Sequence, residues 1–413
     1  MMNFLKAGLT FCCKPGLSFI ALLCVLISLS GCAGRLNKAS QRFYADQPEQ
    51  ALTILQKGDS FGNRSELLYL LEQGVVLHQL GRYQESINQF LEAAAMAKRF
   101  EVISASEQLG SLITSEWLVK YKGEYSERLW IHSYQMMNFL LLGQYDGALV
   151  EAKQALKVLE AYPDALKEDY FSRALIALCF AQVREDNDAY LVYRKLANDL
   201  AKPQAVAADL VQLASRLGMV DEVEHFRPYL PAELPQGEAE LVLFIATDRI
   251  PKKRPGNFFL PPSIRFSFPY YAKTATPPLK LKAVSPEHIT LPPITADFAA
   301  VIRRSLDERK ALIIVKETAR AAAKEAVSQS VGNKHGDAAE VLLRISLLLL
   351  EEPDTRSWQT LPARMTLVRI PLPAGTHRLR LDLTKGSYRD SRIVALPEIQ
   401  LSKGQRFFYS LRL

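Results

Sequence analysis

Cys32 is the residue whose chemistry the sequence defines best. It follows Leu29-Ser30-Gly31 at the end of the apolar stretch Leu17 to Leu29, and Lys6 and Lys14 precede that stretch. A positive segment, a short apolar segment and small residues before a cleavage position are the features of a secretory signal.

This arrangement resembles the lipobox of bacterial lipoproteins. The resemblance implies cleavage directly before Cys32, with acyl chains on its sulfur and on its new amino group, and each methylene buried in a bilayer adds about 0.8 kcal/mol of attachment. It also implies a signal peptide over residues 1–31 and a lipidated tether over residues 32–40. In such proteins an aspartate after the cysteine tends to retain the chain in the inner membrane. Ala33 occupies that position, which favours a lipid anchor in the outer membrane that faces the periplasm. An uncleaved anchor helix is the alternative, but the apolar core is shorter than the roughly 18 residues that a membrane-spanning helix needs.

The other residues that could do chemistry form no recognisable catalytic or metal site. Cys179 is the one further cysteine outside the leader, and its apolar surroundings predict a buried, inert thiol. The histidines are scattered singly, without partners at metal-ligand spacing. The chain has no P-loop, dinucleotide fingerprint or Gly-x-Ser-x-Gly elbow. We therefore predict no catalytic residues, no metal and no cofactor; an active site assembled from distant acidic residues is the alternative.

The positive charge is concentrated near the C-terminal end. The net charge is +7, and the segment Arg364–Leu413 contains ten Lys or Arg residues but three Asp or Glu residues. A basic surface on an exported protein could bind anionic lipid headgroups, lipopolysaccharide phosphates or acidic glycan. The alternative is a solvated sheet face whose arginines serve solubility. Nucleic acid is not an expected partner of an exported protein.

Residues 41–232 show helical periodicity with an internal repeat. In the clearest unit, small residues would let two helices cross closely, a glycine would end the first helix, and aromatic residues would fill the gap between them. This pattern resembles a tetratricopeptide repeat. Further units follow, but their spacing from the first is irregular, so we expect an irregular helical pair around Val102 to Lys120. The marker residues of the clearest unit are Gly74, Gly81, Tyr83, Ser86 and Phe90.

Arrays of this kind bind extended peptides or helices in the groove formed by their first helices. The repeat register predicts a largely apolar groove, which suits an apolar segment of a protein partner. The alternative is that the second half of the chain covers the groove. The candidate partner-binding residues are Leu68, Val75, His78, Trp130 and Met137.

The second half, residues 238–413, predicts an antiparallel β-sandwich-like domain with a helical insertion at about residues 295–352. Short alternating runs separated by glycine turns indicate strands, as in His377–Leu383, where leucines would point inward and arginines outward. Many prolines between residues 251 and 293 exclude a continuous helix there. The predicted fold class is thus α+β, with a helical repeat array followed by this β domain.

Two segments carry a closer likeness. One contains Tyr121-x-Gly-Glu124-x-x-Glu127-Arg128, and the other contains Asp354-Thr-Arg356-Ser-Trp358-x-x-Leu361-Pro362. Together they resemble a family of uncharacterised proteobacterial lipoproteins with tetratricopeptide repeats, which has no established activity. That family's genes lie near those of small lipoproteins that activate peptidoglycan synthases. The resemblance therefore implies a role in the cell envelope, with the peptidoglycan synthesis machinery as one candidate partner.

Both segments also have a direct physical interpretation. Arg356 could pair with Asp354 or lie on the face of Trp358, which favours a structural latch between helix and sandwich over a ligand site. Glu124 and Arg128 have the spacing of an intrahelical pair, whereas Glu127 and His132 need not meet.

These observations together predict a non-catalytic lipoprotein of the outer membrane that acts as a protein-binding scaffold. A glycan- or lipid-binding envelope assembly factor, acting through the basic β domain, is the alternative.

Overall fold

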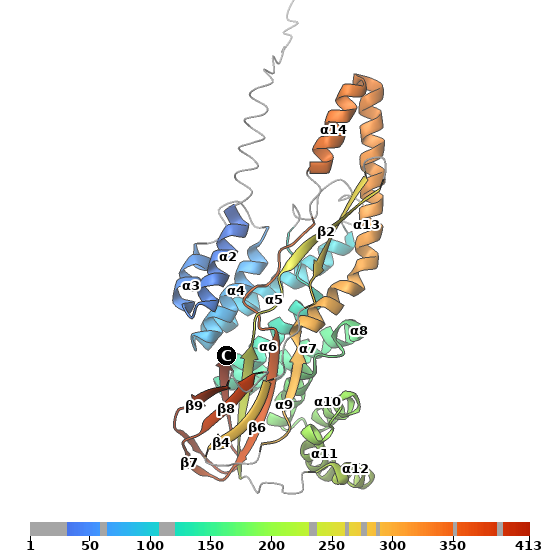
Figure 1. The fold of residues 1–413 in the computed structure, drawn as a ribbon. Coiled ribbons are helices and arrows are strands. Elements are labelled where there is room, and N and C mark those ends of the chain that lie inside the picture. The colour runs from blue at the N-terminus through green and yellow to red at the C-terminus, as the bar shows by residue number, and fades with distance from the viewer. Residues whose placement is uncertain are drawn as a thin grey trace, which may run out of the picture.

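The computed structural model describes residues 31–57, 64–106, 120–230, 238–260, 264–273, 279–285, 290–349, 353–385 and 391–413. The chain has an α+β fold in which a helical array of tetratricopeptide type precedes a β region, and a long helical arm projects from the body (Figure 1). Residues 1–30, the greater part of the predicted signal peptide, lie outside the described residues.

The helices of the first half follow one another in antiparallel pairs, as the repeat pattern predicts. A Cβ on Gly74 would lie 2.4 Å from the ring of Phe90, so the first helix of the clearest unit needs glycine there to approach its partner. Gly81 ends that helix with φ of +72°, and Gly143 repeats the arrangement with +71°. The pairs are α2 (Gly31–Tyr44) with α3 (Pro48–Gln56), α4 (Glu66–Gln79) with α5 (Tyr83–Ser106), α6 (Tyr125–Leu141) with α7 (Tyr145–Ala161), α9 (Tyr170–Gln182) with α10 (Asp186–Asp199), and α11 (Gln204–Arg216) with α12 (Val220–Phe226).

The start of α2 and the end of α5 bear on two local expectations. Helix α2 begins at Gly31 and includes Cys32, and Leu36 and Ala39 are buried, so residues 32–40, which we expected to form a lipidated tether before the first helix, belong to a packed helix. The irregular helical pair expected around Val102 to Lys120 lies largely outside the described residues, because the description stops at Ser106 in α5 and resumes at Lys120.

The described strands form a four-stranded sheet, a three-stranded sheet and two two-stranded pairs. The main sheet has the order β11-β1-β6-β5, and the second sheet has the order β4-β8-β9. The described pairs are antiparallel as predicted, except that β11 runs parallel to β1. The two-stranded pairs are β2 with β3 and β7 with β10. The strands are β1 (Ala239–Thr247), β2 (Lys253–Leu260), β3 (Ile264–Tyr271), β4 (Leu279–Ser285), β5 (Ile294–Asp297), β6 (Arg364–Leu372), β7 (Gly375–His377), β8 (Arg380–Lys385), β9 (Ser391–Ala395), β10 (Ile399–Leu401) and β11 (Arg406–Arg412).

The main sheet is the middle layer of the body. On β1, Leu241 and Leu243 pack against Leu381 and other residues of the second sheet. The alternate residues of β1, such as Phe244, belong to the core shared with the helices. Burial of both faces explains why β1 has a continuous apolar sequence without polar alternation.

The helical insertion forms α13 (Phe298–His335) and α14 (Asp337–Leu349), which are joined at Gly336. The side chain of Asp297 caps α13 by accepting a hydrogen bond of 2.9 Å from Ala300 N. The first part of α13 is fixed in the body through buried residues such as Ile302, Leu306 and Ile313. Beyond that point the two helices leave the body as an arm (Figure 1). Within the described part of the chain, no helix is both long and apolar enough to cross a membrane.

Candidate functional site

The five predicted groove residues are buried in the joint between the two halves of the chain. Leu68, Val75, His78, Trp130 and Met137 each have at most 7% of their surface exposed. Elements of the second half, including β5, β6, β11 and α13, pack against first helices α6 and α9. Elements of the second half thus pack on the face that the repeat register assigns to the groove, and the five candidate residues are not exposed to a partner.

Trp130 illustrates how the second half fills the groove. Its ring stacks on Phe298, the first residue of α13, with 4.1 Å between the ring centroids. Its indole N–H donates a hydrogen bond of 2.7 Å to Asp169 at the start of α9. A large aromatic side chain with its polar atom satisfied is a stable core element, so it is not available to a partner.

Two buried carboxylates hold one segment of the second half by its backbone. We call this segment, Asp354–Leu361, the strap. Glu72 of α4 accepts hydrogen bonds from the backbone N–H groups of Gln359 (2.6 Å) and Thr360 (3.0 Å). Glu127 of α6 accepts one from Trp358 N at 3.1 Å. Burial raises the pKa of Glu72 to about 7, despite these hydrogen bonds, and it also raises the pKa of Glu127.

The strap brings together the two segments that carry the family resemblance. Arg356 forms a bidentate pair with Asp354, with both N–O distances 2.8 Å, as predicted. Its guanidinium lies over the ring of Tyr121, 5.6 Å from the centroid, and not over Trp358. The hydroxyl of Tyr121 in turn donates to Glu127. The predicted latch is therefore present, and it joins the start of α6 to the strap.

Glu124 forms a buried ion-pair cluster beside the strap. Its carboxylate contacts Lys253 Nζ at 2.7 Å and Arg309 Nη1 at 2.6 Å, which belong to β2 and α13. Burial would raise the pKa of Glu124, but the two cations outweigh burial and lower it to about 2. The expected intrahelical pair with Arg128 is not what the structure shows, because this carboxylate faces the second half of the chain.

His78 lies in a buried hydrogen-bond relay that the sequence did not reveal. The amide of Asn138 donates to Ser86 Oγ at 2.9 Å, so its oxygen faces His78 Nδ1 at 2.6 Å and accepts from it. His78 Nε2 is then the acceptor for Ser410 Oγ of β11, at 2.8 Å. Burial lowers the pKa of His78 to about 4, which keeps the ring neutral at neutral pH.

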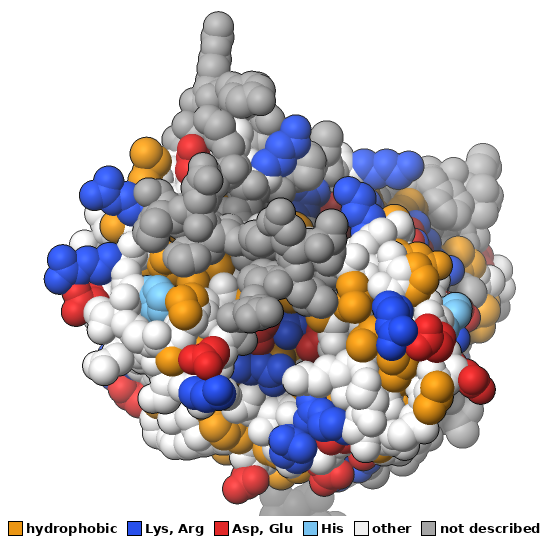
Figure 2. Space-filling model, turned by 90° about the horizontal axis from the view of Figure 1, so that it is seen from below, with side chains coloured by type: hydrophobic (Ala, Val, Ile, Leu, Met, Phe, Trp, Pro, Cys, Tyr) orange, Lys and Arg blue, Asp and Glu red, His pale blue; other side chains and the backbone are white. Residues whose placement is uncertain are grey.

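A second ionic cluster fastens α11 to the main sheet. Arg369 of β6 pairs with Asp209 of α11 and with Glu240 of β1, the latter at 2.7 Å. Glu240 also accepts from Arg406 of β11 at 2.9 Å. These contacts use two of the ten Lys and Arg residues of the C-terminal segment inside the molecule. On the face shown in Figure 2, described Lys and Arg side chains lie beside Asp and Glu side chains and do not form one continuous basic region.

The remaining sequence candidates lie apart from one another. His132 contacts Glu151 at 2.6 Å and does not meet Glu127, as expected. Cys179 is a buried free thiol whose pKa is raised by burial. Leu379, Leu381 and Leu383 point inward, whereas Arg378 and Arg380 are exposed, which confirms the predicted alternation. Among the residues that the structure describes, no group of His, Cys, Asp and Glu side chains could hold a metal ion.

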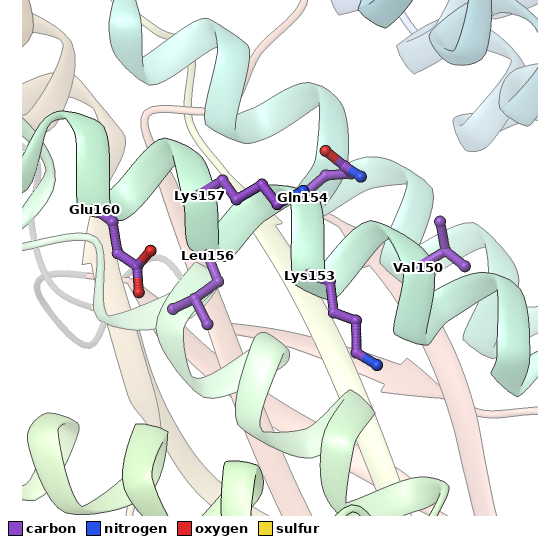
Figure 3. Close-up of a pocket in the computed structure, with 6 residues that line it drawn as sticks. All are labelled: Val150, Lys153, Gln154, Leu156, Lys157 and Glu160. Carbon is purple, nitrogen blue, oxygen red and sulfur yellow. The ribbon is translucent and has the colours of Figure 1, made fainter.

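An open depression of about 400 Å³ lies on the outer helix α7, away from the filled groove. Figure 3 shows the side chains that project from α7 to line it. Val150 is 55% exposed, and Lys153 and Lys157 follow at helical spacing on the same face. The depression is lined by Val150, Lys153, Gln154, Leu156, Lys157 and Glu160.

Comparisons with known proteins find helical repeat structures. The chain is similar to MamA from Desulfovibrio magneticus RS-1, with 16% identity and a TM-score of 0.32 over 47% of this chain and 88% of that one. It is also similar to MamA of strain AMB-1, with 12% identity and a TM-score of 0.33 over 48% of this chain and 88% of that one. A Podosopora anserina protein described as a putative kinesin light chain with nearly identical TPR-like repeats has 14% identity and a TM-score of 0.33 over 48% of this chain and 92% of that one. No family model matches the chain, and no curated protein sequence matches it. These likenesses are too distant to indicate what this chain binds.

Proposed function

We propose that this chain is a non-catalytic lipoprotein, anchored in the outer membrane through Cys32, that serves as a scaffold for a protein partner in the cell envelope. The leader and the Leu29-Ser30-Gly31-Cys32 sequence support the anchor. Because Cys32 lies in the first turn of α2, and α2 packs on the body, the anchor would hold the body close to the bilayer.

The filled groove is the observation that carries the scaffold proposal. The groove that usually binds a partner is occupied by the strap, α13 and β11. Arg309 of α13 pairs with Glu124, Ser410 of β11 bonds to His78, and Trp358 of the strap donates to Glu127. The two halves therefore act as one body that presents its outer helices to partners. The lining of the depression on α7 combines the apolar side chains of Val150 and Leu156 with two lysines, which suits an amphipathic, acidic segment of a partner. The peptidoglycan synthesis machinery remains one candidate source of that partner.

Fractionation of cells tests the anchor. Replacement Cys32→Ala removes the acylation site, so the protein should appear in the soluble fraction. Cys179→Ala is the matched control, because this buried thiol should not affect attachment. Continued membrane attachment of the Cys32→Ala protein would count against the lipid anchor.

Site-specific photo-crosslinking in cells tests the scaffold. A photoreactive residue at position 150 or 157 of α7 should capture one defined protein, identified by mass spectrometry. The same residue at position 137, in the filled groove, should capture none. Capture at position 137 alone would show that the groove opens to a partner and would overturn the proposed binding surface.

Binding of glycan or anionic lipid by the β domain is the second candidate. Arg378 and Arg380 are exposed on the side of the second sheet that lies opposite its buried leucines, which favours this hypothesis over a purely structural role for that face. Crosslinks confined to the Arg378–Arg412 surface, together with copurifying glycan, would support it in place of the protein scaffold.

A further inference from the structure

Helix α14 of the arm presents an apolar face to solvent. Val341 is 53% exposed, Leu342 67% and Ile345 49%. Leu342 and Ile345 follow Val341 by one and four positions, so the three side chains lie on one side of the helix. The other side is held against α13, because Arg344 bonds to Glu325 of α13 at 2.6 Å. Within α14, Arg344 also bonds to Glu340 at 2.9 Å. The helix is thus amphipathic, with its apolar side turned away from its own neighbour.

The arm carries α14 well beyond the body. The part of α13 that follows Ile313, the last of its buried apolar residues that we describe, runs to His335, about 33 Å at 1.5 Å per residue. Gly332 permits close packing of the two helices, since a Cβ there would lie 2.1 Å from Glu340 Oε2. Figure 1 shows that the arm points toward the side of the molecule on which α2 begins, and that α14 lies on the side of α13 nearer to α2.

Helix α2 supplies positive charge at the same side. Its sequence contains Arg35, Lys38 and Arg42 and no acidic residue. Lys38 and Arg42 are exposed. Lys252, which precedes β2, donates to Asn37 of α2 at 2.9 Å and adds a further cation. Basic residues next to a membrane anchor are attracted to anionic headgroups.

We propose that the apolar face of α14 lies in the headgroup and acyl boundary of an anionic phospholipid bilayer, while α2 faces its headgroups. This inference rests on the proposed acylation of Cys32, which places the bilayer at this side of the molecule. An amphipathic helix of this length binds an interface weakly by itself. The acyl anchor raises its effective concentration at the bilayer and makes a weak contact sufficient. Anchor and arm would together fix the orientation of the body and turn α7 and α12 toward the periplasm.

Fluorescence from single positions tests this proposal on the acylated full chain. Val341→Cys and Ile345→Cys are labelled with an environment-sensitive dye, and Val220→Cys on α12, which is 70% exposed at the opposite end of the molecule, is the matched control. Labelling should be selective, because Cys179 is buried and Cys32 is acylated. With vesicles of phosphatidylethanolamine and phosphatidylglycerol, the dye at 341 and 345 should shift to the blue and be quenched by spin-labelled lipid. The dye at 220 should not change.

Flotation of the same samples separates this proposal from the proposed anchor. Protein that floats with vesicles, but whose dye at 341 and 345 behaves like that at 220, overturns the arm contact and leaves the anchor intact. Protein that does not float overturns both. A shift that requires a second protein, or that appears on self-association without vesicles, assigns the face to a protein contact and overturns the lipid proposal. Val341→Asp with Ile345→Asp should abolish quenching at a label on position 338, whereas Val220→Asp should not.

Discussion

The joint between the two halves and the projecting arm use the same kinds of residue in opposite ways. In the joint, Trp358 is fully buried and Glu124 is 2% exposed between two cations. In the arm, Val341 faces solvent, while Arg344 and Glu325 form an ion pair near the surface. The joint therefore combines burial with charge pairing, whereas the arm leaves apolar surface exposed and pairs its charges where water competes.

This difference distinguishes the buried residues of the joint, which stabilise the fold, from the exposed apolar residues of the arm. A buried ion pair contributes little beyond an apolar contact of similar size, but loss of one partner leaves an uncompensated charge and is costly. The joint should therefore tolerate few substitutions. Exposed apolar side chains contribute little to folding, so their presence on α14 suggests contact with something outside the chain.

Trp358→Ala should destabilise the protein most. The ring is buried beside Phe90 and Tyr134, each with a centroid distance of 5.8 Å, so its removal leaves a large cavity in the joint. We expect the free energy of unfolding to fall by about 3–5 kcal/mol, measured by urea denaturation with circular dichroism. Val341→Ala in the arm is the control and should change it by less than about 0.5 kcal/mol. Similar losses in both variants would contradict the contrast between joint and arm.

Arg369→Leu should be the next most damaging change. It leaves Asp209 buried without its cation and removes one of the two arginines at Glu240. We expect a loss of about 3 kcal/mol, measured in the same way. The double variant Arg369→Leu with Asp209→Leu should recover most of that loss, because an apolar pair of similar size replaces the ion pair. If the double variant is less stable than the single one, uncompensated charge is not the cause.

The sequence predicts the elements of both regions better than their contacts. Glycine at position 81 and the repeat pattern around it identify the helical pairs, because these signals are local. The continuous apolar run of β1 identifies a buried strand, but its parallel pairing with β11 joins residues 240–246 to residues 406–412, and no local signal encodes that choice.

The sequence predicts local contacts of the candidate site but not the contacts that join segments far apart in the chain. Asp354 and Arg356 are two residues apart, so their pairing could be predicted from spacing. The contact of Glu72 with the strap joins positions 287 and 288 residues apart, and the relay from His78 to Ser410 spans 332. Nothing in a single sequence indicates such partners. An apolar groove also has the same sequence pattern whether it is filled by a partner or by the chain itself.

Glu72→Gln should change how stability depends on pH. The carboxyl has a pKa of about 7 when folded and an ordinary value of 4.5 when unfolded, so the folded protein binds the extra proton between these values. Its contribution to stability is therefore present below about pH 4.5 and is lost as pH rises toward 7. Relative to wild type, the free energy of unfolding of the Gln variant should rise by about 3 kcal/mol as the pH increases between these limits.

Denaturation at a series of pH values measures this difference, and subtraction of wild type removes the opposite effect of His78. The pKa of His78 is lowered to about 4, so its contribution is lost as pH falls from the ordinary value toward 4 in both proteins. A constant difference between the Gln variant and wild type across this range would show that Glu72 binds no extra proton in the folded state.

Arg344→Ala should have the smallest effect and the most local one. It removes the bonds that tie α14 to Glu325 of α13, in a region where water screens the charges. We expect backbone amides of α14 to exchange with solvent a few-fold faster, measured by hydrogen exchange with mass spectrometry, while the urea midpoint of the whole protein stays unchanged. Arg392→Ala, at an exposed site on β9, is the matched control and should alter neither. Weaker lipid quenching at position 341 in the Arg344→Ala protein would link the packing of α14 on α13 to membrane contact. A lowered global midpoint would instead show that the arm is part of the joint, and the contrast between the two regions would fail.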